Sequence, residues 1–148
     1  NDLLGLSRRF AGTPYEYLAL IEAEQADVER VILLFNSRYL LPNGQSRAIG
    51  DAKEFIKRHE SSHRILRHRL MLGDSYATMA RDYIALNPPE RHTFRFDEFN
   101  SLIAAAREEY FYVSRQDGAP EKIEARGKLQ SVESLNNQIA DLQHTLQQ

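Results

Sequence analysis

Helical periodicity runs through almost the whole chain and is interrupted at three clusters of helix-breaking residues. The clusters are Leu41-Pro42-Asn43-Gly44, Asn87-Pro88-Pro89 and Gln116-Asp117-Gly118-Ala119-Pro120. Proline fixes φ and removes a backbone donor, and glycine weakens a helix interior, so both residues favour turns between helices. The 148 residues suffice for one domain with a hydrophobic core. The pattern therefore predicts a single all-α domain over residues 1–148.

The first long helix has a clear start signal. Thr13-Pro14-Tyr15-Glu16 combines a capping residue, a proline suited to the first helical turn and a glutamate at the capping-box position. Apolar residues then recur at helical spacing until the cluster that begins at Leu41. We expect a helix of roughly 27 residues there, after a short helical segment from Asp2 to Phe10.

The second predicted helix is the longest. Asp51 followed by Glu54 suggests its N-terminal cap, and an apolar face continues from there to Leu86. Gly73-Asp74-Ser75 offers a point where the helix could divide, because glycine costs about 1 kcal/mol in a helix interior. We favour one helix over residues 51–86 with a kink at Gly73.

Two further helices complete the predicted fold. One begins at Asp97 and carries an apolar stripe that ends before Gln116. The other begins at Glu121, and its apolar residues follow alternating spacings of three and four. They are Val132, Leu135, Ile139, Leu142 and Leu146. Four long segments with short connectors predict an up-down-up-down four-helix bundle with a heptad-patterned C-terminal helix.

Composition and charge narrow the function. The chain has 19 Lys and Arg against 21 Asp and Glu, a formal net charge of −2, and no cysteine. Such a balance does not suit a protein that covers nucleic acid with its whole surface. The absence of cysteine excludes disulfides, thiolate metal sites and cysteine nucleophiles. We expect no nucleic-acid partner, no cofactor and, because no convincing catalytic constellation occurs, no enzymatic activity.

One short motif has the form of a zinc site. His59-Glu60-Ser61-Ser62-His63 matches the HExxH pattern, in which histidines at i and i+4 of a helix bind zinc and the glutamate activates water. Here cations flank the motif and no third ligand is evident, since His68 lies about 140° round the axis from His63. We expect His59 and His63 to be partly buried bundle residues, with a metal site at His59, Glu60 and His63 as the alternative.

A cluster of positive charge surrounds that motif. Five arginines and lysines lie between Lys57 and Arg69, and only Glu60 opposes them. Guanidinium groups suit carboxylate and phosphate oxygens, so the cluster indicates either a site for a small anion or a solvated helix face. The residues we assign to the candidate anion site are Arg58, Arg64, His68 and Arg69. Tyr110-Phe111-Tyr112 is the other feature of interest, as core or as an aromatic pocket wall.

The arrangement resembles a class of bacterial receptor domains. Tyr15-Glu16-Tyr17-Leu18-Ala19-Leu20-Ile21 enters the first long helix, and Leu135-Asn136-Asn137-Gln138-Ile139-Ala140-Asp141-Leu142 lies in the last. In period and placement these stretches resemble the extracytoplasmic four-helix sensor domains that chemoreceptors, histidine kinases and diguanylate cyclases carry between two membrane spans. The chain begins at Asn1 without an initiator methionine, which we interpret as a fragment of a longer protein.

The resemblance implies a periplasmic ligand-sensing domain of an inner-membrane receptor. Its terminal helices would continue into membrane helices that are absent here, and it would form a homodimer through helix faces. A small anionic ligand or a periplasmic binding protein would bind between or beside helices, and the signal would be a small shift of the terminal helix. The alternative is a cytoplasmic helical interaction module, such as an adaptor, chaperone or regulatory subunit. A metallopeptidase that uses the HExxH motif is the third hypothesis.

Overall fold

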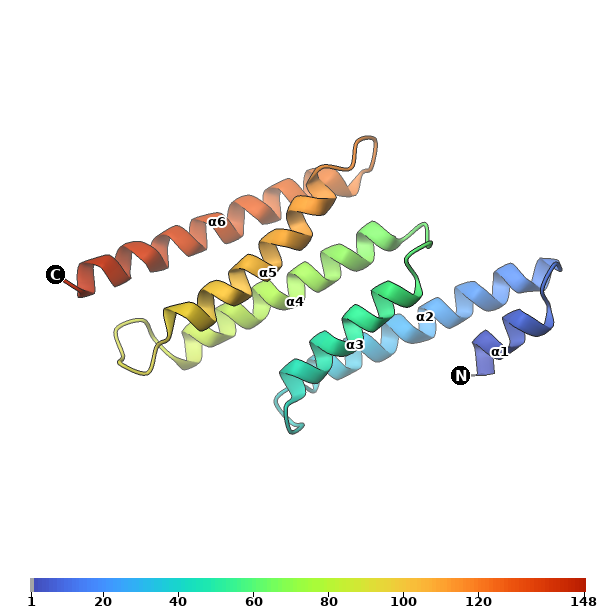
Figure 1. Cartoon of the computed structure of the whole chain (residues 1–148), viewed down its shortest axis with the longest axis horizontal. Coiled ribbons are helices and arrows are strands. Elements are labelled where there is room, and N and C mark those ends of the chain that lie inside the picture. The colour runs from blue at the N-terminus through green and yellow to red at the C-terminus, as the bar shows by residue number, and fades with distance from the viewer. Residues whose placement is uncertain (1) are drawn as a thin grey trace. The chain divides into compact units, whose positions relative to one another are not determined.

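The computed structural model describes residues 2–148, and this part of the chain is all-helical without strands. The described residues form six helices, which are drawn in Figure 1. They are α1 (Asp2–Arg9), α2 (Pro14–Asn36), α3 (Gly44–Arg58), α4 (Ile65–Leu86), α5 (Phe96–Ser114) and α6 (Glu121–Leu146). The all-α fold class is confirmed, and the up-down-up-down four-helix bundle stays a prediction.

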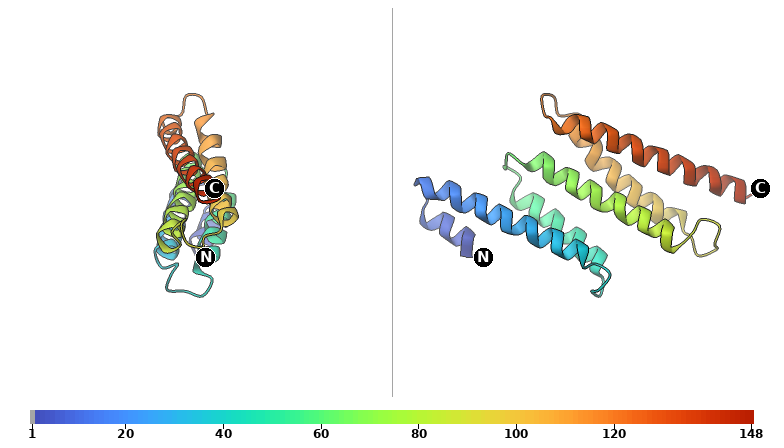
Figure 2. Two further views of the ribbon diagram at one scale, coloured as in Figure 1. Left: turned by 90° about the vertical axis from the view of Figure 1, so that its left-hand side faces the viewer. Right: turned by 180° about the vertical axis from the view of Figure 1, so that it is seen from behind.

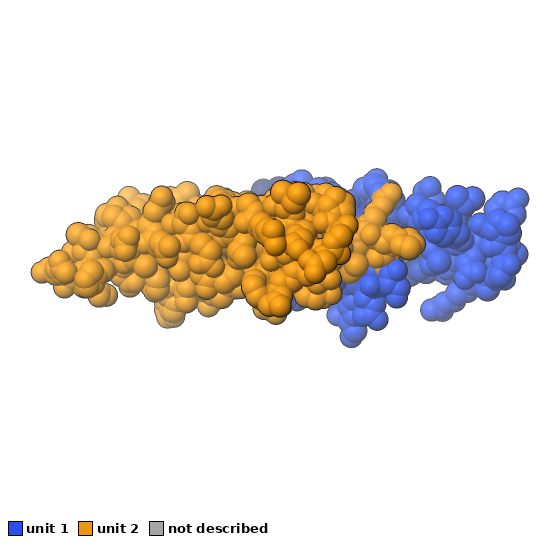
Figure 3. All heavy atoms as spheres, turned by 90° about the horizontal axis from the view of Figure 1, so that it is seen from above, with its two compact units in different colours: residues 1–61 blue, residues 62–148 orange. Residues whose placement is uncertain are grey.

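The chain divides into two compact units, which Figure 3 distinguishes by colour. Unit 1 comprises residues 1–61 and holds α1, α2 and α3, whereas unit 2 comprises residues 62–148 and holds α4, α5 and α6. In unit 1, α2 packs against both α1 and α3. The single bundle domain over residues 1–148 stays a prediction.

The start of α2 lies where the sequence predicts it, but the predicted capping contacts are different. Pro14 is the first residue of α2, and Thr13 precedes it in an extended conformation. The Thr13 hydroxyl donates to the Phe10 carbonyl at 2.6 Å and does not cap the helix. The Glu16 carboxylate accepts a hydrogen bond from the Gly12 N–H at 2.7 Å. Glu16 therefore ties the turn after α1 to the first turn of α2.

The corner between α2 and α3 depends on glycine. The structure starts α3 at Gly44, seven residues before the predicted start at Asp51. Asn43 adopts a left-handed conformation with φ of 52°, and the Gly44 N–H donates to the Leu41 carbonyl at 3.0 Å. A Cβ at position 44 would lie 1.8 Å from the Arg38 carbonyl oxygen. Only glycine allows the two backbone segments to approach this closely.

The predicted single helix over residues 51–86 is wrong. In the structure α3 ends at Arg58 and α4 begins at Ile65, and the six residues between them form turns and a bend. The expected weak point at Gly73 lies inside α4, where the helix continues unbroken. The break therefore falls at residues 59–64, which contain neither proline nor glycine.

Polar side chains explain the break between α3 and α4. The Ser62 hydroxyl oxygen accepts a hydrogen bond from the Arg64 N–H at 3.0 Å, so the side chain replaces a helical backbone acceptor. Serine is a weak helix former for this reason. His59 is the C-cap residue of α3, and its ring turns towards Asp27 on α2. Local competition at Ser62 and a tertiary contact at His59 together end α3.

Unit 2 is built around α5. This helix packs against both α4 and α6, which make few contacts with each other, and neighbouring helices run antiparallel (Figures 1 and 2). The buried apolar residues of α5 follow alternating spacings of four and three and are at most 2% exposed. They are Phe99, Ile103, Ala106, Tyr110 and Val113. The predicted apolar stripe of this helix is therefore confirmed.

The predicted seam of α6 is buried over its first part only. Val132 and Ile139 belong to the core of unit 2, and Leu135 packs against that core while partly exposed. Leu142 and Leu146 continue the same spacing but are 42% and 54% exposed. The last two turns of α6 thus present an apolar edge to solvent.

The continuity of α4 through Gly73 has a packing cause. A Cβ at this position would lie 2.6 Å from Cε1 of Tyr110 on α5, so glycine makes room for the tyrosine ring. The Tyr110 hydroxyl donates to Oδ1 of Asp74 at 2.6 Å, and Nζ of Lys128 on α6 lies 2.5 Å from Oδ2. Burial and this hydrogen bond raise the pKa of Tyr110. Asp74 therefore links all three helices of unit 2.

Candidate functional site

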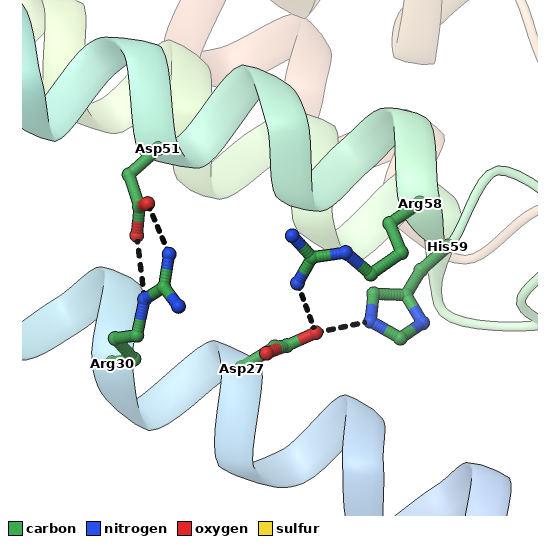
Figure 4. Close-up of polar contacts among 5 residues, drawn as sticks. All are labelled: Asp27, Arg30, Asp51, Arg58 and His59. Atoms are coloured by element: carbon green, nitrogen blue, oxygen red, sulfur yellow. Dashed lines mark hydrogen bonds and ion pairs between the residues drawn. The ribbon is translucent and has the colours of Figure 1, made fainter. Parts of the chain in front are cut away.

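Arg58, the first cation of the candidate anion site, is already paired within unit 1. Its Nη1 donates to Oδ2 of Asp27 at 2.8 Å, and Nε2 of His59 lies 2.8 Å from the same oxygen. Figure 4 shows both contacts reaching from the end of α3 to α2. The side chains of Asp27 and His59 are each 9% exposed. We call Asp27, Arg58 and His59 the polar clasp of unit 1.

The polar clasp favours the ionised form of Asp27. Burial acts to raise the pKa of this carboxyl, but the hydrogen bonds from His59 and Arg58 outweigh it and hold the pKa below its ordinary value. The Phe55 ring packs beside the His59 ring, with 5.0 Å between their centroids. Arg30 and Asp51 form a second ion pair between α2 and α3, also seen in Figure 4. These contacts fasten two helices to each other.

The HExxH motif lacks the helical geometry that a zincin site requires. His59 to His63 lie in the turns between α3 and α4, so the two histidines do not share a helix face. His59 is a partly buried residue bonded across to another helix, as predicted, whereas His63 is exposed and that prediction is wrong. Among residues 2–148, no cluster of three or more His, Asp or Glu side chains could hold a metal ion.

The other three predicted anion-site residues belong to unit 2. Arg64 is exposed and immediately precedes α4, and His68 is buried in the first turns of that helix. Arg69 lies on α4, where its Nη1 donates to Oε2 of Glu109 at 3.1 Å and its guanidinium lies 4.1 Å from the centroid of the Tyr112 ring. Arg58 and Arg69 thus each have a carboxylate partner. The anion site stays a prediction, and Arg58 and Arg64 are its exposed members.

Unit 2 has a groove between α5 and α6. Its volume is about 530 Å³, within the range of ligand sites and helix-binding grooves. Its walls come from α5 and α6, which run antiparallel (Figure 1). Its lining residues are Ala104, Arg107, Glu108, Phe111, Leu129 and Glu133. We call this feature the α5–α6 groove.

The chemistry of the α5–α6 groove combines an apolar floor with charges of both signs. Nη2 of Arg107 donates to Oε2 of Glu133 at 2.9 Å, and Nε lies 2.5 Å from Oε1, so the guanidinium engages both carboxylate oxygens. Both side chains stay about 40% exposed, at 39% and 41%. Phe111 is 49% exposed. The groove therefore offers apolar contact area beside a bidentate ion pair that water still reaches.

Sequence reasoning missed most residues of these two features. Asp27 lies 31 residues before Arg58, and no pattern in the sequence around it predicts their contact. The groove had a detectable signal, because Ala104, Glu108 and Phe111 recur at spacings of four and three on one side of α5. Phe111 was identified only as part of the run Tyr110-Phe111-Tyr112. Its neighbour Tyr110 is a core residue, as expected.

No protein family, characterised protein or solved structure matches this chain. Within residues 2–148, no helix combines the length and the apolar character needed to cross a bilayer.

Proposed function

We propose that the chain is the signal-input domain of a membrane-bound receptor, lying on the periplasmic side of an inner membrane. In this role it binds a ligand or a periplasmic binding protein and passes the event on through its last helix. The four-helix packing of that receptor class is part of the proposal. The antiparallel order of α4, α5 and α6 supports it.

The single observation that carries the proposal is the way α6 packs, mainly against α5. This helix of 26 residues packs along α5 and has few contacts with α4. Its heptad seam is buried at Val132 and Ile139 and exposed at Leu142 and Leu146. A helix packed mainly against one neighbour, and joined to α4 by the Lys128–Asp74 and Arg67–Glu124 ion pairs, can shift between discrete packed positions. Such a shift is the output that the proposed function requires.

The ligand in this proposal is a small anion or an acidic surface of a binding protein. Arg64 supports it, because its exposed side chain lies at the beginning of α4 among other cations. Arg58 and Arg69 are engaged by Asp27 and Glu109, so an anion at those positions must compete with a carboxylate. We therefore place the first contact of an anion at Arg64.

The reading frame of the parent gene tests the proposed function. We expect an apolar span of about 20 residues on each side of the present sequence. Fusion of alkaline phosphatase after Gln148 in the parent protein, upstream of the second span, is expected to give active phosphatase, which folds only outside the cytoplasm. A parent protein without spans, or an inactive phosphatase fusion beside an active β-galactosidase fusion, overturns the receptor proposal.

A second candidate is a cytoplasmic interaction module, and one observation favours it. Several large apolar residues of α2 are exposed, which is a common feature of protein-binding surfaces. They are Tyr15 at 64%, Tyr17 at 61%, Leu18 at 56% and Leu33 at 67%. Capture of a partner by the wild-type chain, lost in a Leu18→Lys/Leu33→Lys variant, would support this candidate. It would be overturned by membrane spans on both sides in the parent gene.

A further inference from the structure

Glu108 is the charged residue of the α5–α6 groove that stays unpaired. Its side chain is exposed, and within residues 2–148 its carboxylate has no hydrogen-bond or ion-pair partner. The other two charged lining residues, Arg107 and Glu133, neutralise each other, because the guanidinium engages both carboxylate oxygens. Two carboxylates against one guanidinium leave the groove with a net negative charge, and that charge lies at Glu108.

Exposed apolar surface lies next to this carboxylate. Phe111 follows Glu108 by three residues, so the two side chains are neighbours on one side of α5, about 4.5 Å apart along the helix axis. The Phe111 residue is 49% exposed. Leu129 lines the same groove from α6 and also packs against the core of unit 2. The groove therefore combines an unpaired anion with apolar contact area within about one helical turn.

Arg115 fixes the order of charges along this side of α5. It directly follows the helix, and its guanidinium lies 5.3 Å from the centroid of the Phe111 ring. The ring attracts a cation at that distance, but Arg115 already occupies this position and repels a second cation. Arg115 is not a lining residue of the groove. A positive charge that enters the groove is thus directed to Glu108, with apolar surface between it and Arg115.

We propose that the α5–α6 groove binds an organic ammonium ion with an apolar tail. The ammonium group lies at Glu108, and the tail covers Phe111 and Leu129. The volume of about 530 Å³ suits a small organic molecule. This site differs in charge and in residues from the anion site of the proposed function, so the inference does not rest on that function.

The composition of the groove disfavours other classes of ligand. A hard metal ion requires several oxygen ligands, whereas here one of the two carboxylates is engaged by Arg107. A small anion would meet a net negative lining. A purely apolar ligand would leave the charge of Glu108 without a partner. An ammonium ion joined to an apolar tail by a spacer of roughly three or four carbon atoms matches the axial distance from Glu108 to Phe111.

The first test compares three probes that share a phenyl ring and a short chain but differ in charge. They are phenylpropylammonium, phenylpropanol and phenylpropanoate. Each is titrated into the isotope-labelled full chain, and binding is followed by the chemical shifts of the backbone amides. We expect phenylpropylammonium to bind in the millimolar range, as its small size allows, and at least about threefold more tightly than phenylpropanol. Phenylpropanoate is expected to bind most weakly.

Two results of this titration would overturn the proposal. One is equal affinity for phenylpropylammonium and phenylpropanol, because the groove would then not recognise the charge. The other is a set of shifted amides that lies outside α5 and α6. Shifts concentrated around Glu108, Phe111 and Leu129, with the ammonium preferred, support it.

The second test removes the unpaired carboxylate. Glu108→Gln keeps the shape of the side chain and is expected to abolish the preference for phenylpropylammonium while leaving the affinity for phenylpropanol unchanged. The matched control is Glu90→Gln, which removes one carboxylate from the exposed loop between α4 and α5, outside the groove. Equal effects of the two substitutions would mean that only the net charge of the chain matters, and they would contradict a site at Glu108.

The third test predicts a gain of affinity, which loss of folding does not produce. Arg107→Gln removes the partner of Glu133 and leaves two unpaired carboxylates in the groove. We expect phenylpropylammonium to bind about threefold more tightly to this variant, with phenylpropanol unchanged. Circular dichroism establishes that the variant remains helical. A folded Arg107→Gln variant without the gain overturns the proposed position of the ammonium group.

The fourth test addresses the apolar tail. Phe111→Ala is expected to weaken phenylpropylammonium and phenylpropanol by the same factor, because it removes contact area that both probes use and leaves Glu108 in place. The ratio of the two affinities should therefore stay at its wild-type value. Unchanged affinities for both probes would overturn the placement of the tail over the ring.

These titrations and the membrane test of the parent gene have independent outcomes. Membrane spans on both sides together with no ammonium preference overturn the inference and leave the receptor proposal standing. A parent gene without spans overturns the receptor, while a preference for the ammonium probe that depends on Glu108 still supports the α5–α6 groove as a cation site.

Discussion

The two units of this chain use similar helices but hold them together by different means. In unit 1, α2 and α3 are joined by Asp27, Arg58 and His59, and by the Arg30–Asp51 pair beside them. The apolar residues buried in α2 and α3 are few and mostly small. They are Ala23, Val31, Ala48, Ala52, Phe55 and Ile56. In unit 2 a continuous apolar core joins α4, α5 and α6.

The difference teaches which forces each unit depends on. An apolar core responds to lost volume and is insensitive to salt and pH, whereas a buried carboxylate responds to its protonation and to the loss of its donors. Unit 2 should therefore be sensitive to core truncation, and Asp27 should make unit 1 sensitive to acid, while unit 2 has carboxylate contacts of its own, such as Lys128–Asp74. Hydrogen exchange read peptide by peptide measures the two units separately in the intact chain.

Truncation of the unit 2 core gives the largest expected effect. Phe99 is 0% exposed, and Phe99→Ala removes a fully buried ring from the apolar core of unit 2. We expect a loss of about 3–5 kcal/mol, seen in urea unfolding and as lost amide protection in unit 2. Phe111→Ala on the same helix is the matched control, and its cost to the monomer is expected below about 1 kcal/mol because the ring is 49% exposed. Equal losses would contradict a core centred on Phe99.

The polar clasp gives the next effect. Asp27→Asn keeps the size of the side chain but removes the charge that Arg58 and His59 share. We expect a loss of about 1.5–3 kcal/mol, as for hydrogen bonds to charged groups, with amide protection reduced first in α2 and α3. Protection lost equally in α5 would show that the two units unfold together and would erase the contrast between them.

The same residue predicts an acid dependence. The pKa of Asp27 in the folded chain lies below its ordinary value of 3.8. Above about pH 4 the carboxylate is charged in both states, so its contribution to stability is fully present. As the pH falls below about 4, the unfolded chain takes up the proton first and the contribution is lost. Asp27→Asn should flatten this part of the stability profile, and an unchanged profile would contradict the role of the clasp.

Gly73 tests how tightly the unit 2 core is packed. In a typical helix Gly→Ala adds stability, but a Cβ here would lie 2.6 Å from the Tyr110 ring, which Asp74 holds through its hydroxyl. We expect Gly73→Ala to cost about 1–3 kcal/mol in thermal or urea unfolding.

Gly127 on α6 is the control for that substitution. No atom lies within 4 Å of its added Cβ, so Gly127→Ala should raise stability by about 0.5–1 kcal/mol. The test is whether the two substitutions change the free energy of unfolding in opposite directions. A stabilising Gly73→Ala would mean that the Tyr110 ring moves away at little cost.

The sequence predicted the starts of α2, α5 and α6, but not the start of α3 at Gly44. α2 begins at Pro14 as expected, and α5 and α6 begin within one residue of the predicted Asp97 and Glu121. The break between α3 and α4 was missed because its cause is a serine side chain and a histidine that contacts α2. Propensity does not detect a helix end that is fixed by a tertiary contact.

The candidate sites were predictable to a smaller extent for a related reason. Charge clustering identified Arg58 and Arg69 as candidate site residues, but it did not identify Asp27 and Glu109, which pair with them from other helices. The partner of a charged group depends on which helix faces come together, and one sequence does not specify this. The groove residues on α5 lie at helical spacing but were not predicted as a site, and Leu129 and Glu133 on α6 could be added only once the pairing of the two helices was known.

The smallest expected effect comes from the second ion pair of unit 1 and isolates burial as the cause of the contrast. Arg30 and Asp51 join the same two helices as the clasp, but the Arg30 side chain is 58% exposed. Arg30→Gln should therefore cost only about 0.2–1 kcal/mol, and less as salt is added, because water screens this pair. Urea unfolding at low and high salt checks both points. If Arg30→Gln cost as much as Asp27→Asn, the strength of unit 1 would lie in charge pairing between α2 and α3 generally, and the buried position of Asp27 would have no special part in it.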